Sequence, residues 1–205
     1  MGCDIHTRIE YFDERESHWL CGDFFRINPY FNGRTPYEAE PYSIVEVCDG
    51  RNYDLFATLA NVRNYNNNPY IDKPRGIPED ACARTERDFR EWGDDAHSAS
   101  WFTLKELIEW RRKAPETVKR SGYISPEAAE KLDKGIEEPE SWWKLRHSNF
   151  VYREWEGEWN HHPLDRLIEE LTRRGTDLHL WYDWYSKEDV EKRADRLRFI
   201  FWFDN

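Results

Sequence analysis

The chain has 205 residues, of which 41 are Asp or Glu and 30 are Lys or Arg, so its formal net charge is −11. Such a charge argues against non-specific binding to nucleic acid, because that affinity comes mainly from neutralising phosphates. No stretch approaches the roughly 18 apolar residues of a membrane span, and residues 1–6 lack the basic and apolar regions of a signal peptide. We therefore expect a cytoplasmic protein with no membrane contact.

Aromatic residues dominate the candidate core. Apolar residues make up only 39% of the chain, but 11 Trp, 11 Tyr and 11 Phe are among them. Each buried aromatic side chain removes roughly 150–250 Å² from water, so few residues suffice for a large core. The length fits a single domain over 1–205. The four cysteines include no CxxC pair, which predicts reduced thiols rather than a disulfide scaffold or zinc site.

Three strands are expected in the first quarter of the chain. Apolar and polar residues alternate over 3–12, which predicts a strand with one polar face. The run 18–27 predicts a second strand, joined to the first by a polar turn. A short strand over 43–47 is expected to end at the Asp49-Gly50 turn signal.

Helices and a long loop follow. Asn52 is a favourable cap for a helix that runs to about Arg63, where apolar residues recur with 3.6-residue periodicity. Residues 64–78 are rich in Asn and Pro and predict a long loop, which is typically functional or mobile. A helix is expected over 78–92, and Thr103 with Glu106 forms a capping box for the next one.

The second half predicts a Trp-rich insertion and a terminal strand. Residues 110–160 are rich in charge and Trp and predict a peripheral helical insertion or lid, including a helix that starts at Ser125. Further on, the patterns predict a helix over 163–174, a strand over 178–185, a short helix after Ser186 and a last strand over 197–203. The fold class expected is α+β, with a mostly antiparallel sheet that contains both terminal strands and has helices packed on it.

Two D-x-H pairs are the candidate metal ligands. Asp4 and His6 lie two apart on a predicted strand and therefore project from the same face. Asp95 and His97 repeat this spacing, and Asp204 follows the last strand. Carboxylate oxygen with imidazole nitrogen suits Zn, Mn, Fe or Mg. The hypothesis is that all five hold a divalent metal, with His6 and His97 as catalytic residues; His6 as an ordinary polar strand residue is the alternative.

Three further residues are candidate ligand-binding groups. Ser98 and Ser100 precede a predicted helix start, where backbone N–H groups attract phosphate. The alternative for these serines is a local turn. Arg63 ends a helix just before the long loop and is the candidate phosphate contact.

Several segments resemble a group of uncharacterised proteins carried by bacteriophages and prophages. The resemblance rests on residues 1–6 (MGCDIH), on 53–64 and 97–101, and on 201–205 (FWFDN). It implies a phage setting and raises the expectation of nucleic-acid metabolism or counter-defence against host nucleotide signals.

Two functions are left open by the sequence. The first is a divalent-metal-dependent hydrolase of a nucleotide or other phosphoester, in which a metal-bound water is the nucleophile. The second is a non-catalytic protein that binds and sequesters a small nucleotide signal. A mimic of DNA is a weaker variant of the second, because basic residues are interspersed among the acidic ones.

Overall fold

The structure is a computed structural model that describes residues 2–33, 40–48, 50–143, 145–146, 149–159, 161–181 and 186–204, without the side chain of His162. The chain forms two compact units. The first unit comprises Met1–Arg51, Lys73–Arg112 and Leu164–Asn205, and the second comprises Asn52–Asp72 and Lys113–Pro163. No helix in the described part combines the length and the apolar character needed to cross a bilayer.

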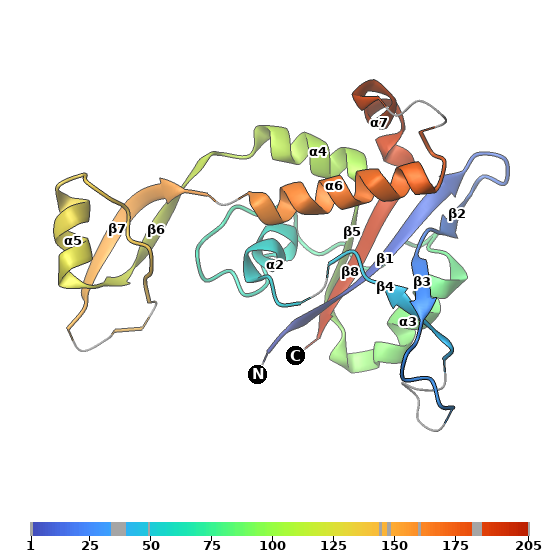
Figure 1. Ribbon diagram of the computed structural model, residues 1–205, viewed down its shortest axis with the longest axis horizontal. Coiled ribbons are helices and arrows are strands. Elements are labelled where there is room, and N and C mark those ends of the chain that lie inside the picture. The colour runs from blue at the N-terminus through green and yellow to red at the C-terminus, as the bar shows by residue number, and fades with distance from the viewer. Residues whose placement is uncertain are drawn as a thin grey trace. The chain divides into compact units, whose positions relative to one another are not determined.

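A four-stranded antiparallel sheet forms the centre of the first unit. Its strands are β1 (Asp4–Asp13), β2 (His18–Cys21), β5 (His97–Thr103) and β8 (Leu197–Asp204). The order is β2-β1-β8-β5, so that the first and last strands are neighbours and the two chain ends lie together (Figure 1). The register pairs Asp4 with Asp204 and continues over eight residue pairs. The predicted α+β class and the pairing of the terminal strands are confirmed.

The two faces of this sheet differ in polarity. Buried apolar side chains fill one face: Ile5, Ile9, Phe102, Phe199, Phe201 and Phe203. Buried leucines continue this apolar core in α4 (Leu104–Lys113) and α6 (His162–Asp177), two helices that run beside each other in Figure 1. The opposite face carries charged residues and is covered by α3 (Ala83–Trp92), whose Asp88 binds Arg8. Asp4 and His6 lie on this polar face.

The predicted strand over 18–27 is two strands in different sheets. After β2, the Gly22 N–H donates to the Ile9 carbonyl, and the Asp23 carboxylate accepts from the Ile9 N–H at 2.8 Å. The Asp23 side chain thus takes the place of the backbone carbonyl that a continuing β2 would offer to Ile9, and the pairing of β2 with β1 ends there. The following residues form β3 (Phe24–Ile27), which pairs with β4 (Tyr42–Val45) in a separate two-stranded sheet.

Capping residues mark most helix starts as predicted. Asn52 accepts from the Leu55 N–H at the start of α2 (Tyr53–Ala60), although this helix ends earlier than expected, at Asn61 in the left-handed conformation. Thr103 and Glu106 form the reciprocal capping box at α4. Ser186 accepts from the Asp189 N–H at the start of α7 (Lys187–Arg193).

Three predicted elements are wrong in type or extent. The helix expected over 78–92 is shorter and is the ten-residue α3. Residues 97–103, for which no strand was predicted, form β5, where Ser98 lies in a bulge at φ 51° and the residues after it alternate across the sheet. Residues 178–181 form turns rather than a strand, and 182–185 lie outside the described residues.

The second unit is not the helical insertion predicted for 110–160. It contains one antiparallel pair, β6 (Thr117–Ile124) and β7 (Val151–Glu158), together with α2 and α5 (Pro126–Asp133). Burial alternates along β6, which is the two-residue period of a strand. Ile124, Ala129 and Trp155 form a small core in this unit. The prediction failed because the charged Arg120 is buried while the aromatic Tyr152 is exposed, so polar and apolar residues do not alternate with burial in this hairpin.

Candidate functional site

The structure brings Asp4, His6 and Asp204 together where β1 begins and β8 ends. The Asp4 N–H donates to Asp204 Oδ1 at 3.1 Å, and His6 Nε2 lies 3.3 Å from Asp204 Oδ2. The side chains of His6 and Asp204 are 19% and 21% exposed, so solvent or a small ligand reaches both. Together with Arg51 and Trp92, these residues are called the terminal-strand cluster below.

Arg51 binds the Asp4 carboxylate in a two-pronged arrangement. Its Nε and Nη2 atoms donate to Oδ1 and Oδ2 at 2.8 and 3.0 Å. These hydrogen bonds hold the pKa of Asp4 below its ordinary value. Gly2 makes room for the guanidinium, because a Cβ at this position would lie 2.1 Å from Arg51 Cζ. Both partners of the ion pair are about half exposed.

Aromatic rings flank the His6 imidazole. The Trp92 ring, at the end of α3, lies 3.9 Å from it between centroids, with planes inclined by 33°. Trp202, the cross-strand partner of His6, lies 5.9 Å away in a stacked orientation. The ring of His6 is therefore fixed by Asp204 through one nitrogen and by two indoles through its faces.

A layer of buried charges continues the polar face behind the cluster. Glu10 is fully buried and accepts two hydrogen bonds from Arg198, at 2.9 Å from Nε and 2.6 Å from Nη2. Arg198 also donates to Asp80 at 2.7 Å. Arg8 donates to Asp88 of α3 at 2.9 Å. These ion pairs attach α3 and the segment before it to the sheet, and α3 carries Trp92.

His97 and Asp95 do not join the cluster. His97 pairs in register with Phe203, which also faces Ile5, so its side chain lies on the apolar face of the sheet, opposite His6. Its Nδ1 lies 3.1 Å from Ser98 Oγ, and its Nε2 is buried without a hydrogen bond to any described residue. Asp95 lies in the short 3₁₀ turn Gly93–Asp95 and is exposed.

The five predicted metal ligands are therefore not arranged around one ion. Arg51 occupies the Asp4 carboxylate, Asp204 is bonded to His6, and His97 projects from the other face. Across the described ranges, no group of three or more His, Cys, Asp and Glu residues is placed to hold a metal ion. In the described structure these five residues therefore do not form one metal site, and metal binding stays a prediction from the sequence.

The predicted phosphate contacts are bonded to residues outside the cluster. Ser100 is fully buried, and its Oγ accepts from the Arg75 N–H at 3.2 Å. Ser98 lies in the bulge beside His97. Arg63 belongs to the second unit, where its Nη1 donates to the Tyr65 hydroxyl at 3.3 Å. Ser98 thus has a local structural role, whereas Ser100 is a strand residue that bonds to a distant segment of the chain.

Trp92 was missed as a site residue, and Arg51 was considered with Arg63 and Arg75 as a phosphate partner, but Arg63 was preferred. Arg51 stands near a helix start, where sequence gives it no partner, and Trp92 is one of 11 tryptophans. The only usable signal was indirect: Asp4 needs a cation if it is to stay ionised near Asp204.

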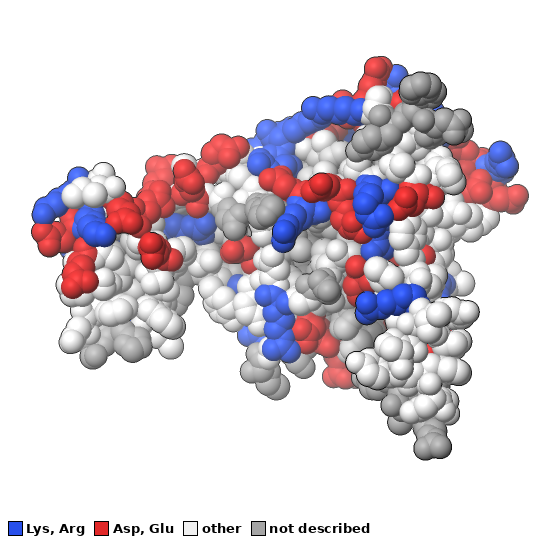
Figure 2. Space-filling model, viewed as in Figure 1, with Lys and Arg blue, Asp and Glu red and all other residues white. Residues whose placement is uncertain are grey.

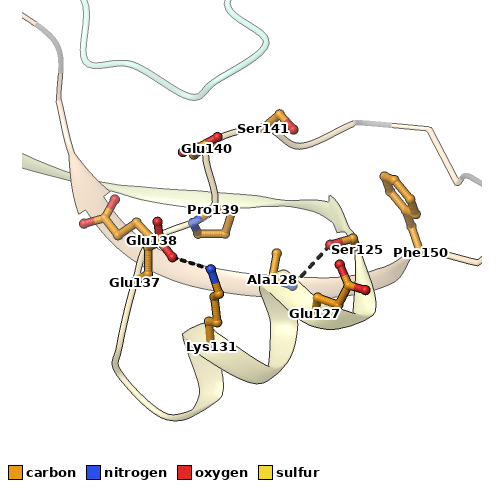
Figure 3. A pocket seen from close by; sticks show the side chains of 10 residues that line it. All are labelled: Ser125, Glu127, Ala128, Lys131, Glu137, Glu138, Pro139, Glu140, Ser141 and Phe150. Atoms are coloured by element: carbon orange, nitrogen blue, oxygen red, sulfur yellow. Dashed lines mark hydrogen bonds and ion pairs between the residues drawn. The ribbon is translucent and has the colours of Figure 1, made fainter.

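The second unit has a pocket of about 300 Å³, which Figure 3 shows from close by. Glutamates dominate its lining, namely Glu127, Glu137, Glu138 and Glu140. The one lysine there, Lys131, is paired with Glu137 at 2.7 Å. Because this lining repels anions, we do not assign a phosphate-bearing ligand to it.

The surface does not mimic a nucleic acid along α6. Figure 2 shows acidic and basic side chains interspersed along this helix. Arg173 is paired with both Glu170 and Asp177, at 2.8 and 2.6 Å. A mimic of DNA needs contiguous negative charge, which this helix does not offer.

Fold and site together define an α+β protein with a His–Asp pair where its two adjacent terminal strands meet. Compared with protein-family models, curated proteins and solved structures, the chain matches none.

Proposed function

We propose that this protein binds and sequesters a small nucleotide at the terminal-strand cluster. The observation that carries the proposal is the His6 imidazole, which is partly exposed, bonded to Asp204 and packed against Trp92. Rigid aromatic surfaces beside fixed hydrogen-bonding groups are what a nucleobase and its sugar require.

The charges of the cluster favour a particular orientation of the ligand. Asp4 and Asp204 are acceptors, so they suit the hydroxyls of a ribose or the amino group of a base. Arg51 is the cation of the cluster and suits a phosphate. Its ion pair with Asp4 is about half exposed, so its rearrangement costs no more than about 1 kcal/mol. The phosphate would then lie at Arg51 and the sugar or base at the carboxylates.

A second candidate function is hydrolysis of the bound nucleotide or phosphoester. The observation that favours it is the contact between Asp204 and His6 Nε2, which leaves Nδ1 as the nitrogen that exchanges a proton with a ligand. A carboxylate that orients a histidine in this way is a common acid–base arrangement. No step is assigned to a metal.

The phage setting and the host cytoplasm are part of the proposal. They rest on the resemblance of residues 1–6, 53–64, 97–101 and 201–205 to phage-encoded proteins. In that setting, sequestration of a host nucleotide signal would protect the phage.

The test is calorimetry with a panel of mono-, di- and cyclic nucleotides, with and without EDTA, followed by chromatography of the recovered ligand. Tight binding of an intact nucleotide that is unchanged by EDTA supports sequestration, whereas conversion of the ligand supports hydrolysis. His6→Ala should abolish either activity. The matched control is His18→Ala, because His18 is an exposed histidine of β2 that bonds only locally, to the Glu16 carbonyl. No binding to any nucleotide would overturn sequestration, and the additional absence of turnover of a general phosphoester such as p-nitrophenyl phosphate would overturn hydrolysis.

A further inference from the structure

Two cysteines that are far apart in sequence meet at the polar face of the first unit. Cys21 ends β2 opposite Glu10 of β1, and Cys82 is the residue that precedes α3. The Cys82 N–H donates to Glu10 Oε1 at 2.9 Å, so Glu10 holds both cysteines in one place. The register of Cys21 with Glu10 and the bond from Cys82 to the same residue therefore make the two thiols neighbours.

The two thiols have unequal surroundings. Cys82 Sγ lies 3.5 Å from Thr85 Oγ1 at the start of the ten-residue α3, where N–H groups and the helix dipole favour a thiolate. The neighbouring Cys21 thiol lowers the pKa of Cys82 to about 7. Cys21 lies 3.6 Å from Asp23 Oδ2, and the neighbouring Cys82 thiol, burial and this carboxylate raise its pKa.

Both cysteines are accessible to small reagents, since each is only partly buried. Arg84, on the first turn of α3, adds positive charge near Cys21. The pair therefore combines a nucleophilic thiol, a neighbouring thiol to resolve the product, and access from solvent. These are the features of redox-active cysteines rather than of inert buried ones.

We propose that Cys21 and Cys82 form a reversible disulfide when the protein meets a peroxide. The Cys82 thiolate attacks one peroxide oxygen, the O–O bond breaks, and a sulfenic acid forms with loss of hydroxide, which takes up a proton to become water. The Cys21 thiol then attacks this sulfur, so that the S–S bond forms, the S–O bond breaks and a second water leaves. In total, two thiols and one hydrogen peroxide give one disulfide and two waters, and a small dithiol reverses the reaction.

The disulfide would tie the start of α3 to the sheet. Asp88 of this helix binds Arg8, and its last residue, Trp92, packs on His6. Oxidation at one end of α3 therefore constrains the helix that supplies an aromatic ring to the terminal-strand cluster. The cross-link also closes a long loop between residues 21 and 82, which restricts the unfolded chain.

The experiment treats the full-length protein with hydrogen peroxide, blocks remaining thiols with iodoacetamide and maps the peptides by mass spectrometry. The expected product is a peptide pair joined through Cys21 and Cys82, which dithiothreitol separates. The oxidised protein should also melt about 5 °C or more above the reduced protein. Cys48→Ser is the matched control and should retain the cross-link, whereas Cys21→Ser and Cys82→Ser should lose it.

Three results would overturn the proposal. The first is recovery of Cys82 as sulfinic acid while Cys21 is alkylated by iodoacetamide and was therefore a free thiol. The second is a disulfide that joins Cys21 or Cys82 to Cys3 or Cys48. The third is a disulfide between two copies of the chain. The peptides are mapped in the wild-type protein, so the test holds even if a serine variant fails to fold. No nucleotide is present, so this outcome is independent of the proposed function.

Discussion

Replacement of Asp23 by Asn should alter how the stability of the protein depends on pH. Asp23 is 8% exposed and accepts the Ile9 N–H at 2.8 Å, where β1 loses its neighbour strand. Burial raises the pKa of this carboxyl from its ordinary value of 3.8 to about 6. The amide of Asn keeps an oxygen for the Ile9 N–H but does not titrate, so the variant isolates the effect of ionisation.

The sign follows from the direction of the pKa change. A carboxyl whose pKa is raised on folding favours the native state when it is protonated. Its contribution to stability is fully present below about pH 4 and is lost as the pH rises through 6. The raised pKa corresponds to about 3 kcal/mol, at about 1.4 kcal/mol for each pKa unit. Between pH 4 and pH 8, Asp23→Asn should therefore gain about 3 kcal/mol of unfolding free energy relative to the wild type.

Urea denaturation followed by Trp fluorescence at pH 4, 5, 6, 7 and 8 measures this difference. Asp94→Asn, at an exposed position of the same unit, corrects for the general effect of removing one negative charge. The reasoning is refuted if the difference between Asp23→Asn and the wild type changes by less than about 0.5 kcal/mol over this range, or if the variant loses stability as the pH rises.

Two further substitutions test the packing that supports the site. Glu10→Ala leaves Arg198 charged and buried, so it should cost about 3–5 kcal/mol of unfolding free energy. The control is Glu191→Ala, which removes an exposed ion pair and should cost less than about 1 kcal/mol in the same urea titration. Gly175→Ala should cost about 1–3 kcal/mol and alter the near-ultraviolet circular dichroism, because the new Cβ would lie 2.2 Å from the buried Trp181 ring. Equal losses for the two glutamates, or an unchanged Trp signal for the glycine variant, would contradict these assignments.

The sequence predicted the features of the fold that depend on local chemistry. Alternation over 3–12 identified the first strand, and the short run 197–203 was recognised as the last one. The polarity of Asp4 and Asp204 predicted that the two strands are adjacent, which the register confirms. Asn52 caps its helix as expected, since capping needs only a side-chain oxygen and a nearby N–H.

Features that depend on tertiary pairing were not predictable in the same way. The break after Cys21 arises because Asp23 bonds to Ile9, which is a contact between strands rather than a local pattern. The separation of His6 from His97 arises from the register of β5 and its bulge at Ser98, and a D-x-H spacing contains no information on register.

The most direct measurement of the central claim is a nucleotide titration observed by NMR on protein labelled with ¹⁵N in its histidine rings. The chain has 7 histidines, and His6→Ala assigns the resonances of His6. Nucleotide binding at His6 predicts that one class of nucleotide shifts the resonances of the His6 ring nitrogens. The shift should saturate at one ligand per chain and should also occur in the presence of EDTA. The prediction is contradicted if no nucleotide shifts the His6 resonances, or if they move only when a divalent metal is added.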